Sequence, residues 1–315
     1  MFNGIVSTRA VSLLSGMVLS VVAAVVPSAR AQESTPYAQI NSAAASSAIT
    51  TSAVRGNVSM FEGSGGNIAV LSTPEGLLMV DAGIAVSKQK LETALRGISR
   101  SPVKYAINTH WHWDHTDGNG WVHESGATIV AHENTATHLR KTIRVAEWGH
   151  TFTPVAMPYR PTLLVKQSKD LVLGSETVRM RYYGPSHTDG DLSIYFPKAN
   201  ILVTGDTWWN GLYPFIDYVA GGSIDGMIEA MNASIAMSDE QTLVIPGHGP
   251  VGNKARLIQY RDMLVAIRNR VAELKKAGKT LDEVTATLPT AAYDGEYGQG
   301  VIKPALFVNL VYRGV

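Results

Sequence analysis

The chain has 315 residues, of which 45% are hydrophobic and 17% charged, and its formal net charge is +1. This length and apolar content suit one large folded domain or two small ones and exclude a disordered protein. The 27 basic and 26 acidic residues are balanced, so the charge does not indicate a nucleic-acid or anionic-membrane partner. The absence of cysteine excludes disulfides, thiolate metal sites, iron–sulfur clusters and cysteine nucleophiles. Any metal must therefore be bound by His, Asp or Glu.

The first 31 residues have the pattern of a cleavable secretory signal. Arg9 precedes an apolar stretch over residues 10–26, and the Ala-Arg-Ala triplet at 29–31 lies where a signal peptidase needs small residues. We expect cleavage after Ala31, which removes two arginines and changes the net charge to −1 (25 basic against 26 acidic residues). The alternative is an uncleaved membrane anchor, since the stretch approaches the length of a span. The expected location is the periplasm or the extracellular medium.

The segment that follows, residues 32–53, is rich in Ala, Ser, Thr and Gln and has almost no large apolar residues. This composition predicts a flexible linker. We expect one α/β domain over residues 54–315, built from two similar halves, because no second linker interrupts the chain. The segment 142–161 has no clear period and is expected to be a surface loop or a lid.

Within this domain, periods typical of strands and helices alternate along the chain. Strands are predicted near residues 58–61, 68–71, 77–80, 103–107, 127–131, 162–165, 177–183, 192–196, 201–204 and 242–245. Helices are predicted near residues 86–99, 118–124, 133–141, 224–237, 253–276, 280–287 and 303–313. The glycine-rich stretch at 62–66 lies between two strands and lacks the context of a nucleotide site, so we expect a hairpin turn there.

Four potential metal ligands lie within six residues, directly after a predicted strand. They are His110, His112, Asp114 and His115. In an extended segment the side chains of His110 and His112 point the same way and can share one metal. Asp114 and His115, at the start of a turn, can face a second metal nearby. This density of imidazoles favours a metal site over a polar surface turn.

Three later segments each present one residue of a metal-binding type beside a glycine, at the end of a predicted strand. These residues are His187, Asp206 and His248. Glycine permits a sharp turn and a close approach of the backbone to a crowded centre. Each segment alone is equally well explained as a solvated turn. Together with the first cluster they predict that five of the nine histidines and two aspartates converge.

The string His110-x-His112-x-Asp114-His115, with His187, Asp206 and His248 after it in that order, resembles the metallo-beta-lactamase superfamily. The resemblance extends from about residue 54 to residue 310 and includes an Asp at the end of a strand, Asp81. It implies an αββα sandwich with a site along one edge and two metals, usually zinc. His110, His112 and His187 would then bind the first metal, Asp114, His115 and His248 the second, and Asp206 would bridge the two.

The coordination chemistry agrees with this implied assignment. Zinc accepts imidazole and carboxylate ligands at about 2.0–2.2 Å, although other divalent transition metals are possible. A metal lowers the pKa of bound water towards ~7 and so supplies hydroxide at neutral pH. We expect this hydroxide to attack a carbonyl carbon, with Asp114 orienting it and then moving a proton. There is no GxSxG motif to indicate a serine nucleophile instead.

One departure from the family bears on the substrate. The β-lactamases of the superfamily carry Cys or Ser where Asp206 stands. A bridging Asp is similar to glyoxalase II, acyl-homoserine lactonases and other esterase-like members, so the expected substrate is a lactone, ester or amide (lactam). A glutathione thioester does not suit an exported protein, and a neutral charge does not suit a nuclease such as ribonuclease Z.

Further residues are candidates for supporting roles. Asp81 and Ser186 are candidates for contacts to ligand imidazoles, although Asp81 is equally well explained as a strand-end cap. Asn210 or Tyr213 could donate a hydrogen bond to an oxyanion. Five of the six tryptophans lie near a predicted ligand, which indicates either an aromatic wall for a bulky apolar substrate or a core behind the metals. Four histidines are not expected to be ligands: His123, His132, His138 and His150.

The leading prediction is therefore a dinuclear zinc hydrolase with two Zn²⁺ per chain and a small-molecule substrate. One alternative is a true β-lactamase that hydrolyses β-lactam antibiotics. A second is a mononuclear iron redox enzyme resembling persulfide dioxygenases, which need two His and one Asp, and the seven ligands argue against it. A third is a metal-binding module without catalysis. No nucleic-acid partner is expected, nor a membrane partner after signal cleavage.

Overall fold

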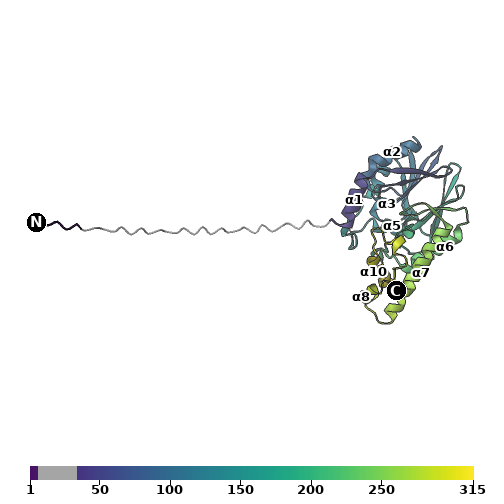
Figure 1. Cartoon of the computed structure of the whole chain (residues 1–315). Helices are drawn as coiled ribbons and strands as arrows, with labels where there is room; N and C mark the ends of the chain where they lie inside the picture. The colour runs from purple at the N-terminus through teal and green to yellow at the C-terminus, as the bar shows by residue number, and fades with distance from the viewer. Residues whose placement is uncertain (6–33) are drawn as a thin grey trace. The chain divides into compact units, whose positions relative to one another are not determined.

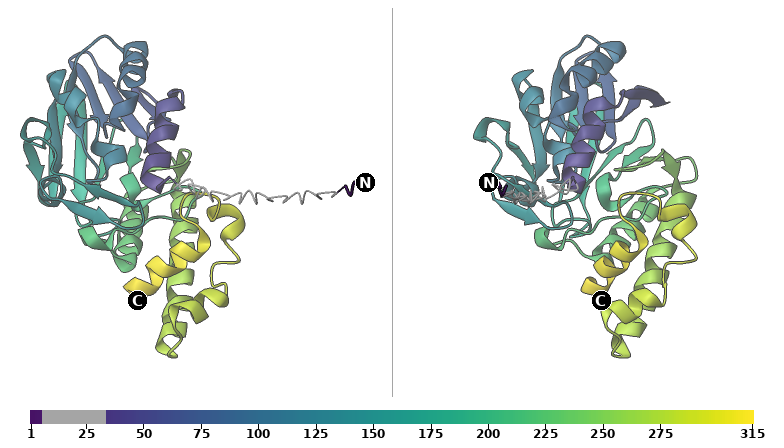
Figure 2. Two further views of the ribbon diagram at one scale, coloured as in Figure 1. Left: turned by 90° about the vertical axis from the view of Figure 1, so that its left-hand side faces the viewer. Right: turned by 60° about the vertical axis from the view of Figure 1, so that its left-hand side comes forward.

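The computed structural model describes residues 1–5 and 34–315, so most of the predicted secretory signal lies outside the described residues. The folded unit spans Ser34–Val315. Its two main sheets, of seven and six strands, lie face to face with helices on their outer faces (Figure 1 and Figure 2). This is the predicted αββα arrangement. In the described part of the chain no helix is both long and apolar enough to span a membrane.

The elements follow the predicted boundaries over most of the chain. The first sheet consists, in spatial order, of β1 (Thr50–Arg55), β2 (Val58–Glu62), β3 (Ile68–Thr73), β4 (Gly76–Val80), β5 (Val103–Ile107), β6 (Thr128–His132) and β9 (Leu163–Val165). The second consists of β10 (Ser168–Leu173), β11 (Glu176–Tyr182), β12 (Leu192–Phe196), β13 (Ile201–Val203), β14 (Leu243–Ile245) and β15 (Gly252–Asn253). The helices are α1 (Pro36–Ser46), α2 (Lys88–Ile98), α3 (Trp113–Thr116), α4 (Asn119–Glu124), α5 (Glu133–His138), α6 (Ile224–Met237), α7 (Lys254–Lys276), α8 (Leu281–Ala286), α9 (Asp294–Tyr297) and α10 (Pro304–Gly314).

The sheets bury both of their faces, and alternation along each strand divides the side chains between two layers. In β3, Ala69 and Leu71 face the space between the sheets. Their neighbours Ile68 and Val70 pack instead with residues of α2 and α4 on the outer face. Because both faces are covered, β3 is almost continuously apolar, as strands buried on both sides are. The glycine-rich stretch joins β2 to β3 as an antiparallel hairpin, as predicted.

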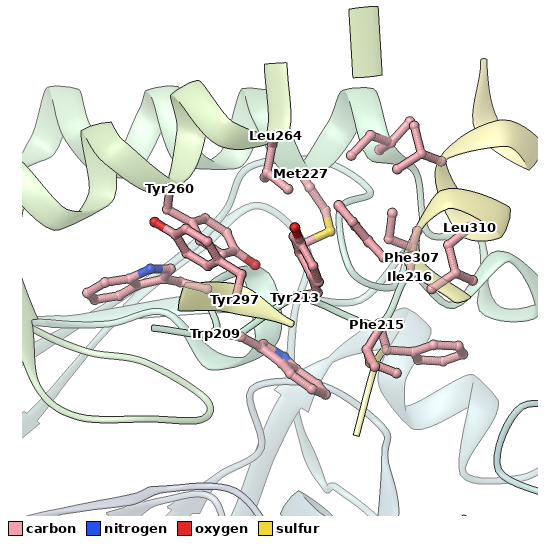
Figure 3. Packing of buried hydrophobic residues seen from close by; sticks show 14 of the residues in the cluster. Trp209, Tyr213, Phe215, Ile216, Met227, Tyr260, Leu264, Tyr297, Phe307 and Leu310 are labelled. Atoms are coloured by element: carbon pink, nitrogen blue, oxygen red, sulfur yellow. The ribbon is translucent and has the colours of Figure 1, made fainter. Parts of the chain in front are cut away.

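The outer face of the second sheet is covered by α6, α7 and α10. Leu202 of β13 and Val244 of β14 project into this layer. Trp209, Tyr213 and Phe215, which follow Asp206 in the chain, are packed within it (Figure 3). The segment after Asp206 is therefore held by a large aromatic core.

The strand directions bring the predicted ligands to one edge of the sandwich. β4 and β5 are parallel, so the residues after their ends, Asp81 and the loop from Asn108, emerge together. β13 and β14 are also parallel, and Asp206 and His248 follow their ends. β12 runs antiparallel to β13, so His187, which precedes β12, lies at the same edge. The topology thus gathers ligands that are far apart in the sequence.

The flexible linker predicted over residues 32–53 is wrong across its described part. Residues 36–46 form α1, and β1 pairs with β2 at the edge of the first sheet. The Tyr37 ring stacks on the His150 ring at 3.6 Å between centroids, and Ala44 is buried in the same core as Trp148. These tertiary contacts outweigh the weak helical signal of an Ala/Ser-rich segment. The ordered domain consequently begins before residue 54.

The segment 142–161, expected as a loop or a lid, contains a small hairpin of β7 (Ile143–Val145) and β8 (His150–Phe152). A short 3-10 helix, Met157–Tyr159, follows it. Trp148, at the turn of the hairpin, is buried and accepts a hydrogen bond on its carbonyl oxygen from the backbone N–H of Tyr37. The hairpin therefore packs against α1.

α1 is held at its C-terminal end by one ammonium group. Lys90 Nζ lies 2.5 Å from the carbonyl oxygen of Ala44, 3.1 Å from that of Ala45 and 2.5 Å from that of Ser47. The Ser87 hydroxyl donates to the same Ala44 carbonyl at 3.2 Å. A cation at this end also complements the partial negative charge of the helix terminus.

Removing this ammonium should loosen α1 without unfolding the protein. In Lys90→Met we expect amide protection of residues 37–46 to fall about tenfold, which corresponds to about 1–2 kcal/mol, because a charge-assisted cap is lost. Hydrogen exchange read by mass spectrometry measures this. Lys88→Met is the matched control, since Lys88 pairs with Glu124 at 3.7 Å and both side chains are about half exposed. Equal protection in the two variants would show that Lys90 does not hold α1.

Candidate metal centre

The loop after β5 positions four of the predicted ligands. His112 is extended, with φ −61° and ψ 147°, and directly precedes the single turn of α3. The Thr116 hydroxyl donates to the carbonyl oxygens of Trp111, at 3.2 Å, and His112, at 3.0 Å, which fixes this turn. The change from extended chain to helix directs His110 and His112 into one group and Asp114 and His115 into another, as the sequence predicts.

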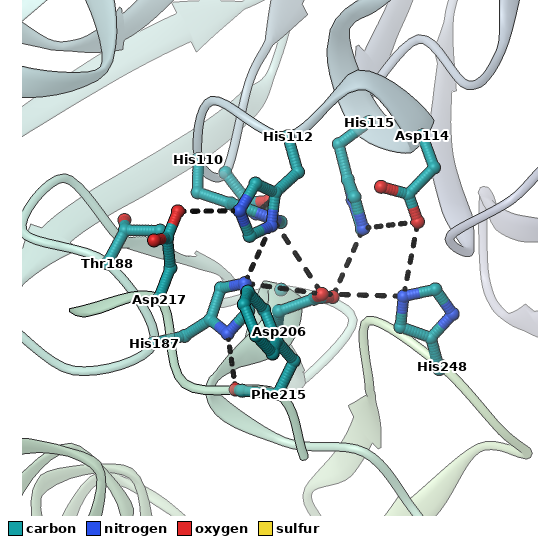
Figure 4. Close-up of polar contacts among 12 residues, drawn as sticks. His110, His112, Asp114, His115, His187, Thr188, Asp206, Phe215, Asp217 and His248 are labelled. Atoms are coloured by element: carbon teal, nitrogen blue, oxygen red, sulfur yellow. Dashed lines mark hydrogen bonds and ion pairs between the residues drawn. The ribbon is translucent and has the colours of Figure 1, made fainter. Parts of the chain in front are cut away.

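The first group contains His110, His112, His187 and Asp206, all fully buried or nearly so. His112 Nδ1 lies 3.1 Å from His110 Nε2 and 2.9 Å from His187 Nε2. Asp206 Oδ2 lies 3.7 Å from His110 Nε2 and 3.5 Å from His187 Nε2. Figure 4 shows these ligand atoms directed toward one point.

The second group contains Asp114, His115 and His248, and Asp206 reaches it as well. Asp114 Oδ2 lies 3.6 Å from His115 Nε2 and 3.4 Å from His248 Nε2. Asp206 places Oδ1 3.1 Å from His115 Nε2 and Oδ2 3.4 Å from His248 Nε2. The Asp206 carboxylate therefore lies between the two groups, where a bridging ligand would be (Figure 4).

Four of the five imidazoles are held from behind by an acceptor on the ring nitrogen that faces away from the centre. These contacts are His110 Nδ1 to Thr109 Oγ1 at 3.0 Å, His112 Nε2 to Asp217 Oδ2 at 2.9 Å, His187 Nδ1 to the Phe215 carbonyl at 2.8 Å and His115 Nδ1 to Asp81 Oδ2 at 2.7 Å. The Thr109 hydroxyl donates to Asp81 at 2.9 Å and is thus free to accept from His110. In a neutral imidazole each acceptor places the ring proton outward, so the inward nitrogen then carries the lone pair that a metal needs.

This arrangement fits bound cations. Inward lone pairs at 2.9–3.1 Å from one another repel unless a positive charge lies between them. Within the described residues, three buried atoms of the second group have no hydrogen-bond partner: His115 Nε2, His248 Nε2 and Asp206 Oδ1. Buried polar atoms are normally satisfied, and imidazole with carboxylate is a donor set that zinc accepts. The seven residues therefore form a candidate metal centre.

Three glycines let the backbone approach this centre. A Cβ on Gly66 would lie 2.2 Å from His115 Cε1, and one on Gly247 would lie 1.9 Å from Asp206 Oδ1. A Cβ on Gly65 would lie 2.5 Å from Asp114 Cβ. The glycine-rich stretch predicted as a simple hairpin turn is thus also a wall of the centre, which sequence reasoning did not recognise.

The charges of the two groups differ when no metal is bound. Burial lowers the pKa of His187 to about 4, and burial with the nearby His115 holds the pKa of His110 well below its ordinary value. Burial acts in the same direction on His248, but Asp206 and Asp114 outweigh it and raise the pKa of His248 to about 9. A proton on the second group then takes the place of a cation near the two carboxylates.

Asp81 fills both of the roles predicted for it. Its carboxylate accepts from His115 Nδ1, and Oδ1 also accepts from the backbone N–H of Thr109 at 2.7 Å. It has a φ of +70°, which is unusual for a residue other than glycine. Such strain persists only where the surroundings enforce it, and it directs the carboxylate at the ligand.

Three other predictions of supporting roles are wrong. The Ser186 hydroxyl donates to Asp191 at 2.5 Å and not to an imidazole. The Asn210 amide donates to the Pro250 carbonyl at 2.8 Å, and the Tyr213 hydroxyl donates to Asp294 Oδ1 at 2.9 Å. Tyr213 is completely buried in the hydrophobic core, where its ring stacks on that of Phe307 (Figure 3). Neither Asn210 nor Tyr213 lines the cavity that contains Asp114, Asp206 and His248, so neither is placed as an oxyanion donor in this conformation.

Sequence reasoning missed Asp217 and Asp191. Asp217 accepts from His112 and, at 3.1 Å, from Trp111 Nε1, and Asp191 accepts from Ser186 and from the N–H and hydroxyl of Thr188 on either side of His187. Neither residue belongs to a recognisable motif. The only signal that the sequence offers is an Asp next to a mainly apolar segment. That signal does not indicate a contact with a ligand.

A cavity of about 340 Å³ lies over the two groups and is lined by Asp114, Asp206 and His248. Trp113 and Trp209 also line it, as does Trp148, the one tryptophan not expected near a ligand. The other three, Trp111, Trp121 and Trp208, are buried in core packing, so both interpretations of the tryptophans hold in part. Outside both ligand groups lie His123, His132, His138 and His150, as predicted.

Comparison with known proteins agrees with this geometry. The family model for the metallo-beta-lactamase superfamily matches residues 62–250. A type 2 metallo-beta-lactamase from Bacillus sp. (strain 170) is 26% identical over 201 residues, which cover 63% of this chain and 72% of the relative.

Two solved structures share the fold. The DIM-1 metallo-beta-lactamase has a TM-score of 0.56 at 21% identity, covering 69% of this chain and 97% of that one. The sec-alkylsulfatase Pisa1 from Pseudomonas sp. has a TM-score of 0.63 at 15% identity, covering 84% of this chain and 50% of that one. At such identities the likeness extends to the fold alone.

Replacing Asp217 should weaken metal binding by the first group. One oxygen of Asp217 accepts from His112 and Trp111, and the other accepts from the backbone N–H groups of Val219 and Ala220. In Asp217→Asn, the amide NH₂ must replace one of these two acceptors. The tautomer of His112 is then no longer fixed. We expect metal affinity about 10–100-fold lower, measured by competition with a chromophoric chelator. Asp225→Asn is the control, because Asp225 pairs with Arg268 at the surface. Unchanged affinity in a folded Asp217→Asn protein would contradict this role.

The buried Asp191 should make stability depend on pH. Burial raises its pKa to about 6 from 3.8, so the folded protein holds this proton more tightly than the unfolded chain. Stability should therefore fall as pH rises from about 4 to about 6, by up to about 3 kcal/mol, and stay reduced above. Asp191→Asn should lack this fall. Urea unfolding of the metal-free proteins across this range measures the difference, and parallel curves would refute it.

Proposed function

Because the chain belongs to the metallo-beta-lactamase superfamily, we propose that it is a dinuclear zinc hydrolase that cleaves a lactone, ester or amide bond. The proposal rests on one observation above all: seven His and Asp side chains converge, and four of the imidazoles have their ring protons directed outward. A module that only bound metal would not require the open cavity above them.

Each ligand has a place in this proposal. His110, His112 and His187 would hold the first zinc, and Asp114, His115 and His248 the second. Asp206 would bridge them, since its two oxygens face different groups. Zinc, when bound, would supply a Lewis acid that polarises the carbonyl group of the substrate and would lower the pKa of water.

The protein's own residues would do the rest of the chemistry. Asp114 lines the cavity beside His248 and is the carboxylate suited to take the proton from the attacking water and pass it to the leaving group. Asp81 and Asp217 would keep His115 and His112 in the tautomers that bind metal. The buried position of the centre would restrict bulk water around the reacting atoms.

Hydrolysis of β-lactams is the second candidate, and a relative that is a metallo-beta-lactamase favours it. Asp206 stands against it, since the resemblance places Cys or Ser there in the family's β-lactamases. Export to the periplasm or the medium is a further proposal from the sequence pattern. The start of the folded unit at Ser34 supports it, because cleavage after Ala31 would leave that unit whole.

A metal-defined substrate panel tests the proposal. The metal-free protein, reconstituted with zinc, should hydrolyse aryl esters or lactones in preference to thioesters and β-lactams. His110→Ala should lose at least ~100-fold in kcat/KM and part of its zinc, because a ligand of the first group is removed. His123→Ala is the matched control, since His123 is exposed and belongs to neither group.

Three results would count against the proposal. Purified protein that holds one iron and no zinc would favour the redox alternative. Full turnover in His110→Ala would refute the assigned centre. Efficient turnover of β-lactams alone would establish the second candidate instead.

A further inference from the structure

The cavity over the candidate metal centre has an apolar wall, built mainly from segments near the two ends of the folded unit. Ile40, Ala43 and Ala44 of α1 line one side. Val301, in the segment between α9 and α10, and Leu212 line another. Residues 36–46 and residue 301 lie outside the range 62–250 that the family model matches. Except for Leu212, this wall is therefore an addition to the part of the fold that carries the candidate ligands.

The α1 side of the wall is firmly attached. Lys90 and Ser87 bind the carbonyl oxygens at the end of the helix. At its start, the Tyr37 ring packs at 5.1 Å from the Trp113 ring, between centroids, and stacks on His150. A wall fixed at both ends has a defined shape, as a surface that selects a substrate must have.

The lining of this cavity offers no Lys or Arg within the described part of the chain. Its ionisable groups all belong to the candidate metal centre, where His248 Nε2 lies 3.4 Å from a carboxylate oxygen of both Asp114 and Asp206. Arg256 lines a neighbouring depression but is paired with Glu296 and with Asn210. An anionic substituent directed against the apolar wall, away from the candidate metal centre, would thus lose its water without gaining a cation, which is costly.

We propose that this cavity selects an uncharged carbonyl compound with an aliphatic or aromatic substituent, and that Ile40 of α1 limits the size of that substituent. This inference rests on the proposed hydrolase function and specifies its substrate class. Trp113, Trp148 and Trp209 supply flat apolar surface for such a substituent. A volume of about 340 Å³ admits a small ligand only, so loss of a side chain from the wall should be felt.

The selection against charge can be tested with nearly isosteric pairs. 4-Acetoxybenzamide and 4-acetoxybenzoate differ mainly in one negative charge. With the zinc-loaded protein we expect kcat/KM to favour the amide by about 10–100-fold, because the carboxylate would be buried unpaired. In Val301→Lys this ratio should shrink at least ~10-fold, since the new ammonium can pair with the carboxylate. Val301 is half exposed, so the lysine should be tolerated.

The role of Ile40 can be tested with acyl chains of increasing length. Ile40→Ala should raise kcat/KM for hexanoyl esters relative to acetyl esters by about tenfold, because the wall recedes. Gln39→Ala is the matched control: Gln39 lies on the same turn, is exposed and is not part of the lining. An unchanged ratio in Ile40→Ala would overturn this assignment.

Binding provides a readout that does not depend on turnover. Quenching of tryptophan fluorescence by the ketones 4-acetylbenzamide and 4-acetylbenzoate should give tighter binding of the amide, with and without zinc. If no ester or lactone is hydrolysed, the proposed function fails, and the selectivity of ketone binding alone decides the inference. Equal binding of both ketones, or hydrolysis of both esters at equal rates, would overturn the inference while leaving a hydrolase intact.

Discussion

Lone pairs that face one another at 2.9–3.1 Å repel, and burial removes the water that would weaken this repulsion. The centre of this protein forces three such lone pairs together and places two carboxylates beside them. The contacts behind the imidazoles hold this arrangement, and cations bound between the inward nitrogens would relieve the repulsion. Most structural features near the site hold the imidazoles and carboxylates in place against this repulsion.

Several of the residues that hold the site follow the ends of two parallel strand pairs, β4 with β5 and β13 with β14, which meet at one edge of the sandwich. Asp81 is the clearest case: it follows β4, accepts from the backbone that follows β5 and fixes His115. It does so at a φ of +70°, and strain of this kind costs about 1–3 kcal/mol. Asp217 fixes His112 in a similar way, by accepting from its outward ring nitrogen. It lies in a segment that is held by the aromatic core on the outer face of the second sheet. Rigid packing thus replaces local preference as the source of precision.

The difference between strand ends and tertiary packing explains which features the sequence could predict. Ligand spacing depends on the period of an extended strand and on strand ends, so His110, His112, His187 and the rest were accessible to reasoning from pattern and resemblance. The groups behind the ligands have no fixed spacing, and Asp217 and Asp191 were missed for that reason. Tyr213 was assigned wrongly because its hydroxyl direction is set by Asp294, eighty-one residues away in the chain. Composition likewise failed for α1, whose order depends on tertiary contacts with His150, Trp148 and Lys90.

The same distinction separates the chemistry from the selection of substrate. The seven candidate ligands lie within the range that the family model matches, and their geometry follows from the sandwich itself. The apolar wall comes from α1 and from the segment before α10, which pack on the sandwich without contributing a ligand. A change in either segment can alter the shape and charge of the cavity while the imidazoles, the acceptors behind them and Asp206 between the two groups stay in place. Under the proposed function, substrate preference would therefore be set by parts of the fold that the candidate metal centre does not need.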